Sequence, residues 1–532
     1  MRTVFHKLKI AKAALMVAVS ALLFSCSSFL EPSQDLIQDR DDHYQNLDQV
    51  RRGVIGAYAG LQDLVEELVV LGDLRADLMT TTRNYDAFLE EIELHNVSAD
   101  NPYIDARPYY DIILNCNDIL DNMAKAKADP QMTELQYNGL EAEVKTLRAW
   151  VYLQLARTYR KVPVVKESLN GTFGDYDPPV YGMVDMVNWL IQEMNEAIEQ
   201  PVPDWRVFQK EKDKDPKEVS QPWRLTRISR KALLGELYLE SGNYMRASEL
   251  FYDAIISGGT GKDDLTLKCS EASGSDWRKF WEVVSIGDHV SKVEHLTAIP
   301  FSRSQHQRNG LMSLFSNNPV HSYVLKPTEL AVQAWESQPR DGSSGVLFTG
   351  DFTRGLNKSY ARIGIDTLVY KYMLGKSPTR NQNDAVYCIY RAADLHLLYA
   401  EAINLAGDSD KALDVINEKL DGSPKTAGVR GRVGLKGVNL QNIQDRYPEM
   451  SARKDLVEMA ILEERALEFA YEGRRWNDLV RFATRSNRLT WFAETVARKF
   501  KETDPEKYKS VKNLLKDKDN WRYEMPRKTL DL

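Results

Sequence analysis

The feature that most constrains the fold of this chain is a helical-hairpin pattern in residues 229–259. Small and large side chains recur there at helix spacing, in the order Leu234, Gly235, Tyr238, Tyr244, Ala247, Phe251 and Ala254. Small residues such as Gly235 and Ala247 let two antiparallel helices approach closely, while the large ones fill the wedge beside them. This spacing is typical of a tetratricopeptide repeat. One such hairpin cannot bury its apolar face alone, so partner hairpins are expected elsewhere in the chain.

Three other regions carry looser versions of the same pattern. They are residues 399–416, residues 461–482 with a turn at Gly473, and residues 150–159 followed by 183–197. The four regions are scattered along the chain and are not in tandem. We therefore predict a mainly α protein, an α–α superhelix of four tetratricopeptide-like helix pairs interrupted by long insertions.

The pattern changes between residues 258 and 387. Gly, Ser, Asn and Pro become frequent, helical periodicity fades, and short β-like pieces occur at 297–299 and 346–348. We predict a long irregular insertion with short strands over about 259–387. It separates scaffold segments of about 46–258 and 388–485, and a C-terminal extension of 486–532 follows. Long irregular segments on a rigid scaffold are common places for binding functions.

The N-terminus has the form of a secretory signal. Lys7, Lys9 and Lys12 precede an uncharged stretch from Ala13 to Ser25, which is too short to span a bilayer. The stretch ends at Cys26, in a context that resembles the lipobox of bacterial lipoproteins. We predict that residues 1–25 are a signal peptide, that Cys26 is acylated, and that residues 26–45 are a lipidated tether.

Charge and cysteine content exclude several functions. Without residues 1–25 the chain has 66 basic and 77 acidic residues, a net charge of −11, which argues against nucleic acid as a partner. Cys116, Cys269 and Cys388 are odd in number and have no Cys-x-x-Cys spacing. We expect neither a disulfide framework nor a metal site, and Cys116 fits a buried helix position.

No motif predicts catalysis or a cofactor. The chain has no His-Glu-x-x-His, no Gly-x-Ser-x-Gly and no EF-hand loop, and residues 258–262 lack the spacing of a phosphate loop. Glu464, Glu468 and Glu472 recur every four residues, so on one helix they form a row and cannot face each other across a glycosidic bond. We interpret them as an ion-pair network with Arg465, Arg474 and Arg475.

Six segments together resemble the SusD/RagB family of outer-membrane nutrient-binding lipoproteins. They are CSSFLEP (26–32), YYDIILNCNDIL (109–120), EVKTLRAWVYLQLARTYRKVPVV (143–165), residues 227–258, RAADLHLLYAEAIN (391–404) and ILEERALEFAYEGRRWNDLVR (461–481). The resemblance implies one SusD-like domain over 46–532, with four helical pairs supporting an irregular ligand-binding region. It also implies an acylated protein at the outer membrane that faces outward. Such a protein covers a SusC-like TonB-dependent barrel that imports oligosaccharides or, in some members, peptides.

The resemblance also indicates where a ligand is held. In this family the ligand face draws on loops after the first long helix and on the irregular insertion. The first region supplies Asp77, Arg83, Asn84, Tyr85, Asn101 and Tyr103, and the insertion supplies Trp277, Trp281 and Trp335. The stretch 83–85 combines a guanidinium, an amide and a ring, as sugar recognition requires. The spacing of Trp277 and Trp281 also fits the buried side of a helix.

We therefore predict a surface-exposed glycan-binding lipoprotein that is not an enzyme and has no catalytic residue, cofactor or bound metal. Three alternatives remain open from the sequence. The same fold could bind peptides for import, or act as a helical scaffold for protein assembly. The third is a helical-barrel glycoside hydrolase, which requires two carboxylates from different elements facing each other in a cleft.

Overall fold

The structure is a computed structural model. It describes residues 43–168, 177–201, 224–257, 277, 281, 295–301, 309–316, 323–341, 347–372, 385–417 and 428–526. The predicted signal peptide, Cys26 and most of the predicted tether lie outside the described residues, as do Cys269 and residues 258–262.

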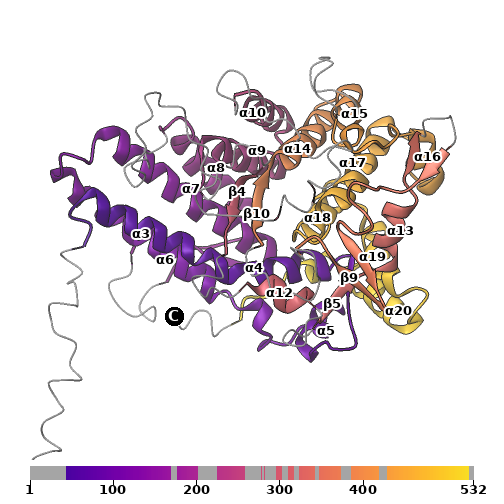
Figure 1. The fold of residues 1–532 in the computed structure, drawn as a ribbon. Coiled ribbons are helices and arrows are strands. Elements are labelled where there is room, and N and C mark those ends of the chain that lie inside the picture. Colours follow the sequence, from indigo (N-terminus) through magenta and orange to yellow (C-terminus); the bar gives the residue numbers. More distant parts are fainter. Residues whose placement is uncertain are drawn as a thin grey trace, which may run out of the picture.

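A layer of paired helices forms the body of the molecule (Figure 1). Each helix packs against the next along the chain. In order they are α7 (Glu134–Thr158), α8 (Met183–Ala197), α9 (Arg227–Ser241), α10 (Tyr244–Ser257), α14 (Ala392–Leu405), α15 (Ser409–Asn417), α17 (Arg453–Phe469) and α18 (Arg475–Ser486). The mainly α class and the four predicted hairpins are thus confirmed, as α7–α8, α9–α10, α14–α15 and α17–α18.

The α9–α10 hairpin shows why the small residues matter. A Cβ atom added to Gly235 would lie 2.8 Å from the ring of Phe251, which is fully buried. Gly242 ends α9 with a left-handed backbone (φ +85°), which only glycine adopts at little cost. The hairpin therefore closes as the sequence pattern predicts.

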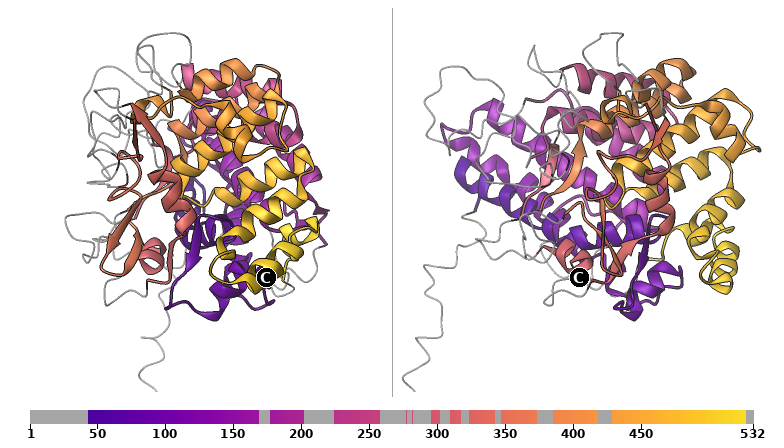
Figure 2. Two further views of the ribbon diagram at one scale, coloured as in Figure 1. Left: turned by 90° about the vertical axis from the view of Figure 1, so that its right-hand side faces the viewer. Right: turned by 45° about the vertical axis from the view of Figure 1, so that its right-hand side comes forward.

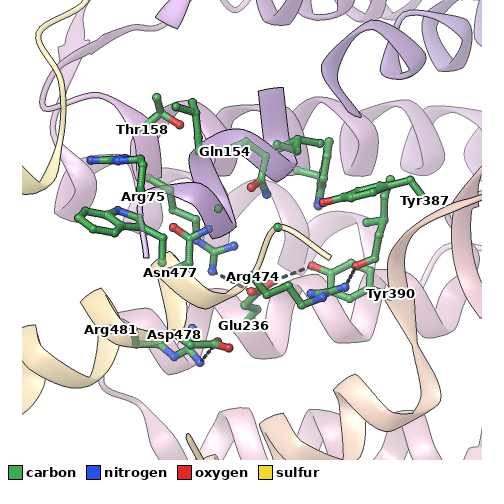
Figure 3. A pocket seen from close by; sticks show the side chains of 18 of the residues that line it. Arg75, Gln154, Thr158, Glu236, Tyr387, Tyr390, Arg474, Asn477, Asp478 and Arg481 are labelled. Carbon is green, nitrogen blue, oxygen red and sulfur yellow. Dashed lines mark hydrogen bonds and ion pairs between the residues drawn. The ribbon is translucent and has the colours of Figure 1, made fainter. Parts of the chain in front are cut away.

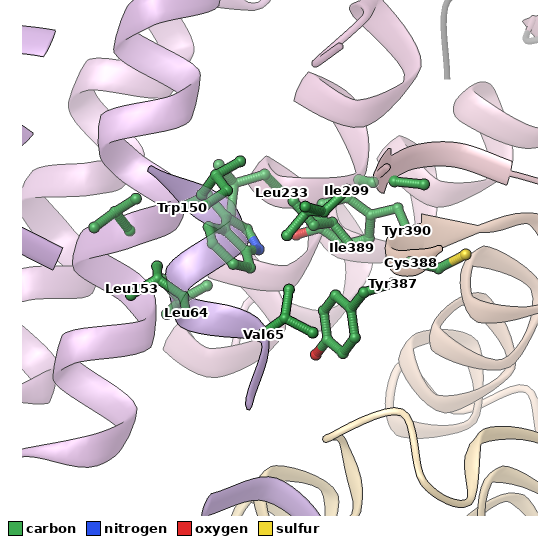
Figure 4. Packing of buried hydrophobic residues seen from close by; sticks show 14 of the residues in the cluster. Leu64, Val65, Trp150, Leu153, Leu233, Ile299, Tyr387, Cys388, Ile389 and Tyr390 are labelled. Atoms are coloured by element: carbon green, nitrogen blue, oxygen red, sulfur yellow. The ribbon is translucent and has the colours of Figure 1, made fainter. Parts of the chain in front are cut away.

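The N-terminal third begins outside the helical pairs and then enters their core. Its helices are α3 (Leu47–Ala59), α4 (Leu61–Val69), the π-helix η3 (Val70–Leu74), α5 (Ala87–Glu93), α6 (Arg107–Asn122), and the 3₁₀ turns η4 (Pro102–Ile104) and η5 (Met123–Ala128). Figure 4 shows Leu64 and Val65 of α4 packed among Trp150 of α7, Leu233 of α9 and Tyr387 of the central strand β10. Segments distant in sequence thus share one apolar core.

Two backbones touch where η3 meets the α17–α18 turn. A Cβ atom on Gly72 would lie 2.0 Å from the carbonyl oxygen of Gly473. The amide of Gly473 donates to Asp73 Oδ2 at 2.5 Å. Gly473, predicted as the turn of this hairpin, has φ +72°. Glycine is required on both sides of this contact because any side chain would separate the two segments.

The insertion lies on one face of the helical layer, as the left panel of Figure 2 shows. It contains α12 (Gly310–Phe315) and α13 (Glu329–Glu336). Short strands pair antiparallel as β1 (Met79–Thr81) with β5 (Leu325–Pro327), β4 (His295–Ile299) with β10 (Tyr387–Arg391), β2 (Val162–Pro163) with β3 (Val180–Tyr181), β6 (Pro339–Asp341) with β7 (Leu347–Thr349), and β8 (Tyr360–Ile363) with β9 (Asp366–Val369). The β-like pieces predicted near 297–299 and 346–348 correspond to β4 and β7.

The C-terminal segment builds a second core against α17 and α18. It contains η11 (Gly431–Val433), α16 (Leu440–Arg446), α19 (Leu489–Ala497), η12 (Arg498–Phe500), α20 (Pro505–Leu514) and η13 (Lys518–Trp521). The rings of Trp476, Phe492 and Trp521 meet there. The chain then returns to the first core, where Tyr523 forms a bridge with Tyr159.

Cys116 and Cys388 are both buried free thiols, and Cys116 has the core position expected for it. Within the described ranges, every helix is too short or too polar to cross a bilayer.

We expect Gly235→Ala to destabilise the protein by about 1–3 kcal/mol, because the new methyl group meets Phe251. This exceeds the gain of about 0.5–1 kcal/mol that alanine gives in a helix interior. Gly56→Ala is the matched control. Gly56 is exposed in α3 with no atom within 4 Å of its added Cβ, so this variant should be more stable than the wild type. Urea unfolding checks both, and an unchanged midpoint for Gly235→Ala would contradict the packing described.

Candidate functional site

The loop of residues 82–86, here called the 82–86 loop, joins strand β1 to helix α5 and carries Arg83, Asn84 and Tyr85. Strand β1 is held by its pairing with β5. At the other end, Asp86 Oδ1 accepts from the amide of Leu89 at 2.9 Å and caps α5. Both ends of the loop are therefore fixed.

Hydrogen bonds to the insertion set the path of the loop itself. The amide of Thr82 donates to the carbonyl of Val324 at 2.8 Å, and Thr82 Oγ1 donates to the carbonyl of Tyr323 at 2.5 Å. The amide of Asn84 donates back to Thr82 Oγ1 at 3.1 Å. A buried threonine thus ties the loop to a segment more than 230 positions later in the chain.

The β8–β9 hairpin supplies a carboxylate beside the loop. Arg83 Nη1 lies 3.1 Å from Oδ1 of Asp366, the first residue of β9. The hydroxyl of Tyr323 donates to the carbonyl of Thr367 at 2.7 Å and fixes the start of the same strand. The Arg83 side chain is 64% exposed, so the pair adds little to stability and stays accessible to a ligand.

Tyr85, two residues after Arg83 in the same loop, exposes its ring to solvent. Its exposed fraction is 40%, and Phe88, in the first turn of α5, is also exposed. Lys507 of α20 pairs with Glu90 of α5 at 2.8 Å and borders the same region. The surface therefore combines aromatic and charged groups.

We call Arg83, Asn84, Tyr85 and Asp366 the binding face. A tyrosine ring can stack on the apolar face of a sugar, and a planar guanidinium or carboxylate can bond to neighbouring hydroxyl groups. A fixed backbone beneath these side chains lowers the entropy lost on binding. In the described part of the chain, no three His, Cys, Asp or Glu side chains are grouped so as to hold a metal ion.

Asp77, which the sequence assigned to the ligand face, is fully buried. Its carboxylate forms two hydrogen bonds with Arg475, at 2.8 and 3.0 Å, and one with Arg498 at 2.9 Å. Burial by itself would raise the pKa of Asp77, but these two guanidinium groups hold its pKa below the usual range. The structure corrects the assignment: Asp77 joins β1 to α18, and no lone pair faces solvent.

Asn101 and Tyr103, at the 3₁₀ turn η4, bond to other residues of the N-terminal segment. Asn101 is buried, and its amide donates to the carbonyl of Phe88 at 2.9 Å and to Glu91 at 3.0 Å. Tyr103 is half-buried, with its hydroxyl 3.3 Å from Glu66. Asn101 therefore orders the α5 region, which corrects its assignment as a ligand contact.

The three tryptophans of the insertion are interior residues. Trp277, Trp281 and Trp335 are each at most 1% exposed. The indole of Trp277 donates to Ser359 Oγ at 3.3 Å, and that of Trp335 donates to the carbonyl of Leu467 at 3.2 Å. These positions correct the assignment of Trp277 and Trp335 to the ligand face. Trp335 fastens the insertion to α17, while Trp277 bonds within the insertion.

The carboxylate row on α17 is an ion-pair network, as predicted, but its partners differ. Glu464 pairs with Arg354 and Arg430, Glu468 with Arg354, Arg391 and Arg432, and Glu472 with Lys371 and Arg391. The expected partners, Arg465, Arg474 and Arg475, bind aspartates elsewhere. Helix α17 ends at Phe469, so Glu472 is in the following turn and not on the helix. Arg354 and Lys371 of the insertion, Arg391 of β10, and two arginines of residues 430–432 occupy the side of α17 where the row lies.

A cavity of about 60 Å³ lies between α7, η3 and α18. A sugar site requires a cleft of several hundred Å³. The cavity is therefore too small to hold an oligosaccharide. The candidate residues for ligand contact are those of the binding face.

Sequence reasoning missed Asp366, Thr82 and Tyr323. A signal for the first existed. Two short segments rich in apolar residues, 360–363 and 366–369, flank Gly364-Ile365, and a two-residue turn that begins with glycine is typical of a tight hairpin. Gly364 indeed has φ +61°. No local pattern indicates that this hairpin meets the 82–86 loop, because the contact is purely tertiary.

Residues 335–531 match the sequence model of the SusD family. A SusD-like protein of Formosa agariphila is 22% identical over 512 residues, covering 89% of this chain and 92% of that protein. A solved SusD superfamily protein from Bacteroides vulgatus superposes with a TM-score of 0.68 at 16% identity, covering 92% of this chain and 97% of the other. A solved laminarin binding SusD-like protein gives a TM-score of 0.60 at 18% identity, covering 92% and 98%.

We predict that Glu468→Gln costs about 3–5 kcal/mol, because it removes one charge from a buried network. Burial alone would raise the pKa of Glu468, but Arg432, Arg391 and Arg354 together lower it. The wild type therefore gains this stability above the carboxyl's ordinary pKa of 4.5 and loses it as the pH falls below that value. The variant should lose less stability on acidification.

Glu463→Gln on the same helix is the control, since Glu463 pairs with Arg446 at the exposed surface. Its expected cost is about 0–1 kcal/mol. Urea unfolding at pH 7 and pH 4 measures both variants. Equal costs for the two would contradict the buried network.

Proposed function

From the premise that this chain is a member of the SusD family, we propose that it is a surface glycan-binding protein and not an enzyme. The observation that carries the proposal is the binding face. There the exposed ring of Tyr85 lies in the same short loop as Arg83, whose guanidinium pairs with the carboxylate of Asp366. Ring, guanidinium and carboxylate are the groups that sugar recognition uses, and the loop beneath them is fixed at both ends.

A second part of the proposal concerns where the protein works. We propose that it is exported, acylated on Cys26 and held on the outer face of the outer membrane, where it delivers oligosaccharides to a SusC-like TonB-dependent transporter. The basic and then apolar N-terminus and the lipobox-like context of Cys26 support the anchor. Family membership supports the transporter partner.

We expect Tyr85→Ala to weaken glycan binding by about tenfold or more, because a stacking aromatic contributes about 0.5–1.5 kcal/mol beyond the apolar area it buries. Arg83→Ala should weaken binding as well, through loss of bonds to hydroxyl groups. The measurement is calorimetric titration of residues 27–532 with a panel of soluble polysaccharides that begins with laminarin.

Tyr252→Ala is the matched control, because Tyr252 on α10 is 38% exposed against 40% for Tyr85 and lies on a different element. Its affinity should equal that of the wild type. Unchanged affinity in both Tyr85→Ala and Arg83→Ala would remove the binding face from the proposal. If every polysaccharide failed and short peptides bound, the cargo would be peptide. If neither bound, the assembly-scaffold alternative would replace ligand capture.

Cys26→Ala is expected to release the protein from the membrane fraction, because acyl chains on this residue are the proposed anchor. The checks are fractionation of cells that express the full chain, and labelling with a palmitate analogue. Cys116→Ala and Cys388→Ala should leave both readouts unchanged, since these thiols are buried. A labelled, membrane-bound Cys26→Ala protein would disprove the anchor while leaving glycan binding untouched.

A further inference from the structure

The cavity between α7, η3 and α18 lies where the first and last helical pairs meet the N-terminal segment. Residues of α7, η3, α9, β10 and α18 line it, and Figure 3 shows Arg75, Gln154, Glu236, Tyr390, Arg474 and Arg481 around it. Its volume is about 60 Å³. A cavity of roughly 10–15 Å³ holds one water molecule, so this one has room for a small guest and some water.

The lining has an excess of hydrogen-bond donors. Four lining residues carry a buried N–H group that no protein atom accepts, namely Arg75 Nε, Arg157 Nε, Arg474 Nε and Trp476 Nε1.

The two carboxylates of the lining, by contrast, are both paired with guanidinium groups. Glu236 accepts from Arg157 at 2.7 Å and from Tyr390 at 2.7 Å, one bond on each carboxylate oxygen. Asp478 accepts from Arg481 at 3.0 Å and from Arg465 at 2.8 Å, again one on each oxygen. The buried side-chain atoms of the lining that have no hydrogen-bond partner at all are therefore all donors.

Arg75 also brings a charge that no carboxylate balances. It is 1% exposed, and within the part of the chain that the structure describes no acidic side chain pairs with it. Its guanidinium lies 4.0 Å from the ring of Trp476 and 4.3 Å from that of Tyr523, and it donates to the carbonyl of Trp521 at 3.0 Å. Burial lowers the pKa of Arg75. A buried cation without a counter-ion is costly in free energy.

We propose that this cavity is a binding site for a small monovalent anion such as chloride. An anion accepts hydrogen bonds from the N–H groups that have no protein acceptor, needs no acceptor itself, and balances the charge of Arg75. Water can accept from the same N–H groups, but a water molecule brings no charge to balance that of Arg75. The anion would join η3, α7 and α18, and would stabilise the folded chain by mass action.

Two measurements on the wild-type chain, residues 27–532, test the site. The first is thermal unfolding in sodium chloride and in sodium gluconate at equal ionic strength and pH. We expect a higher melting temperature in chloride, rising with its concentration, because gluconate is too large for the cavity. The second is anomalous scattering from crystals grown in bromide, with a peak expected inside the cavity.

Trp476→Phe removes one donor and keeps an aromatic ring against Arg75. It should raise the chloride dissociation constant by about tenfold, as for one hydrogen bond to a charged partner. Trp491→Phe is the matched control, since Trp491 Nε1 also lacks an acceptor but lies on α19, away from the cavity. Its chloride dependence should equal that of the wild type.

Equal melting temperatures in chloride and gluconate would overturn the proposal, and the cavity would then hold water alone. A bromide peak without that difference would also overturn it, as binding at crystal concentration only. Because both measurements use the wild type, they decide the question even if Trp476→Phe does not fold. Neither outcome bears on glycan binding at the binding face.

Discussion

The rest of the structure depends on three buried carboxylates, those of Glu464 and Glu468 in α17 and of Glu472 in the turn that follows. Their cations come from separate parts of the chain: Arg354 and Lys371 from the insertion, Arg391 from β10, and Arg430 and Arg432 from the segment before α16. All eight side chains are nearly inaccessible to solvent. Because a buried charge without its partner is strongly unfavourable, the irregular insertion has one low-energy place on the helical layer.

Strand β9 connects this buried ion-pair network to the binding face. Lys371 lies just after β9 and is bound at Glu472, while Asp366 at the other end of β9 pairs with Arg83. The strand is thus anchored in the core at one end and presents a carboxylate at the surface at the other. Trp335 secures the neighbouring part of the insertion through its bond to α17. A segment of low helical content can in this way carry a preorganised surface.

The sequence predicted those parts of the fold whose signal is local. The spacing of Gly235, Tyr238, Ala247 and Phe251 is a property of two consecutive helices, and each of the four hairpins indicated by such spacing is present. The acid row was also recognised as structural, because helix geometry keeps Glu464 and Glu468 from facing each other. The partners of that row could not be predicted from the sequence, since they are contributed by segments up to 114 positions away.

Of the candidate site, the sequence alone predicted the stretch 83–85, because ring, guanidinium and amide are adjacent there, and this stays a prediction. The sequence also determined the helical class, since helical periodicity is a local pattern of apolar residues. Only the tertiary structure decided which polar and aromatic residues reach the surface. Asp77, Asn101 and Trp335 are of the same polar and aromatic types as the exposed residues of the 82–86 loop. Their burial depends on which segments pack over them. The pairing of Arg83 with Asp366 across 283 positions is likewise created by folding and has no local trace.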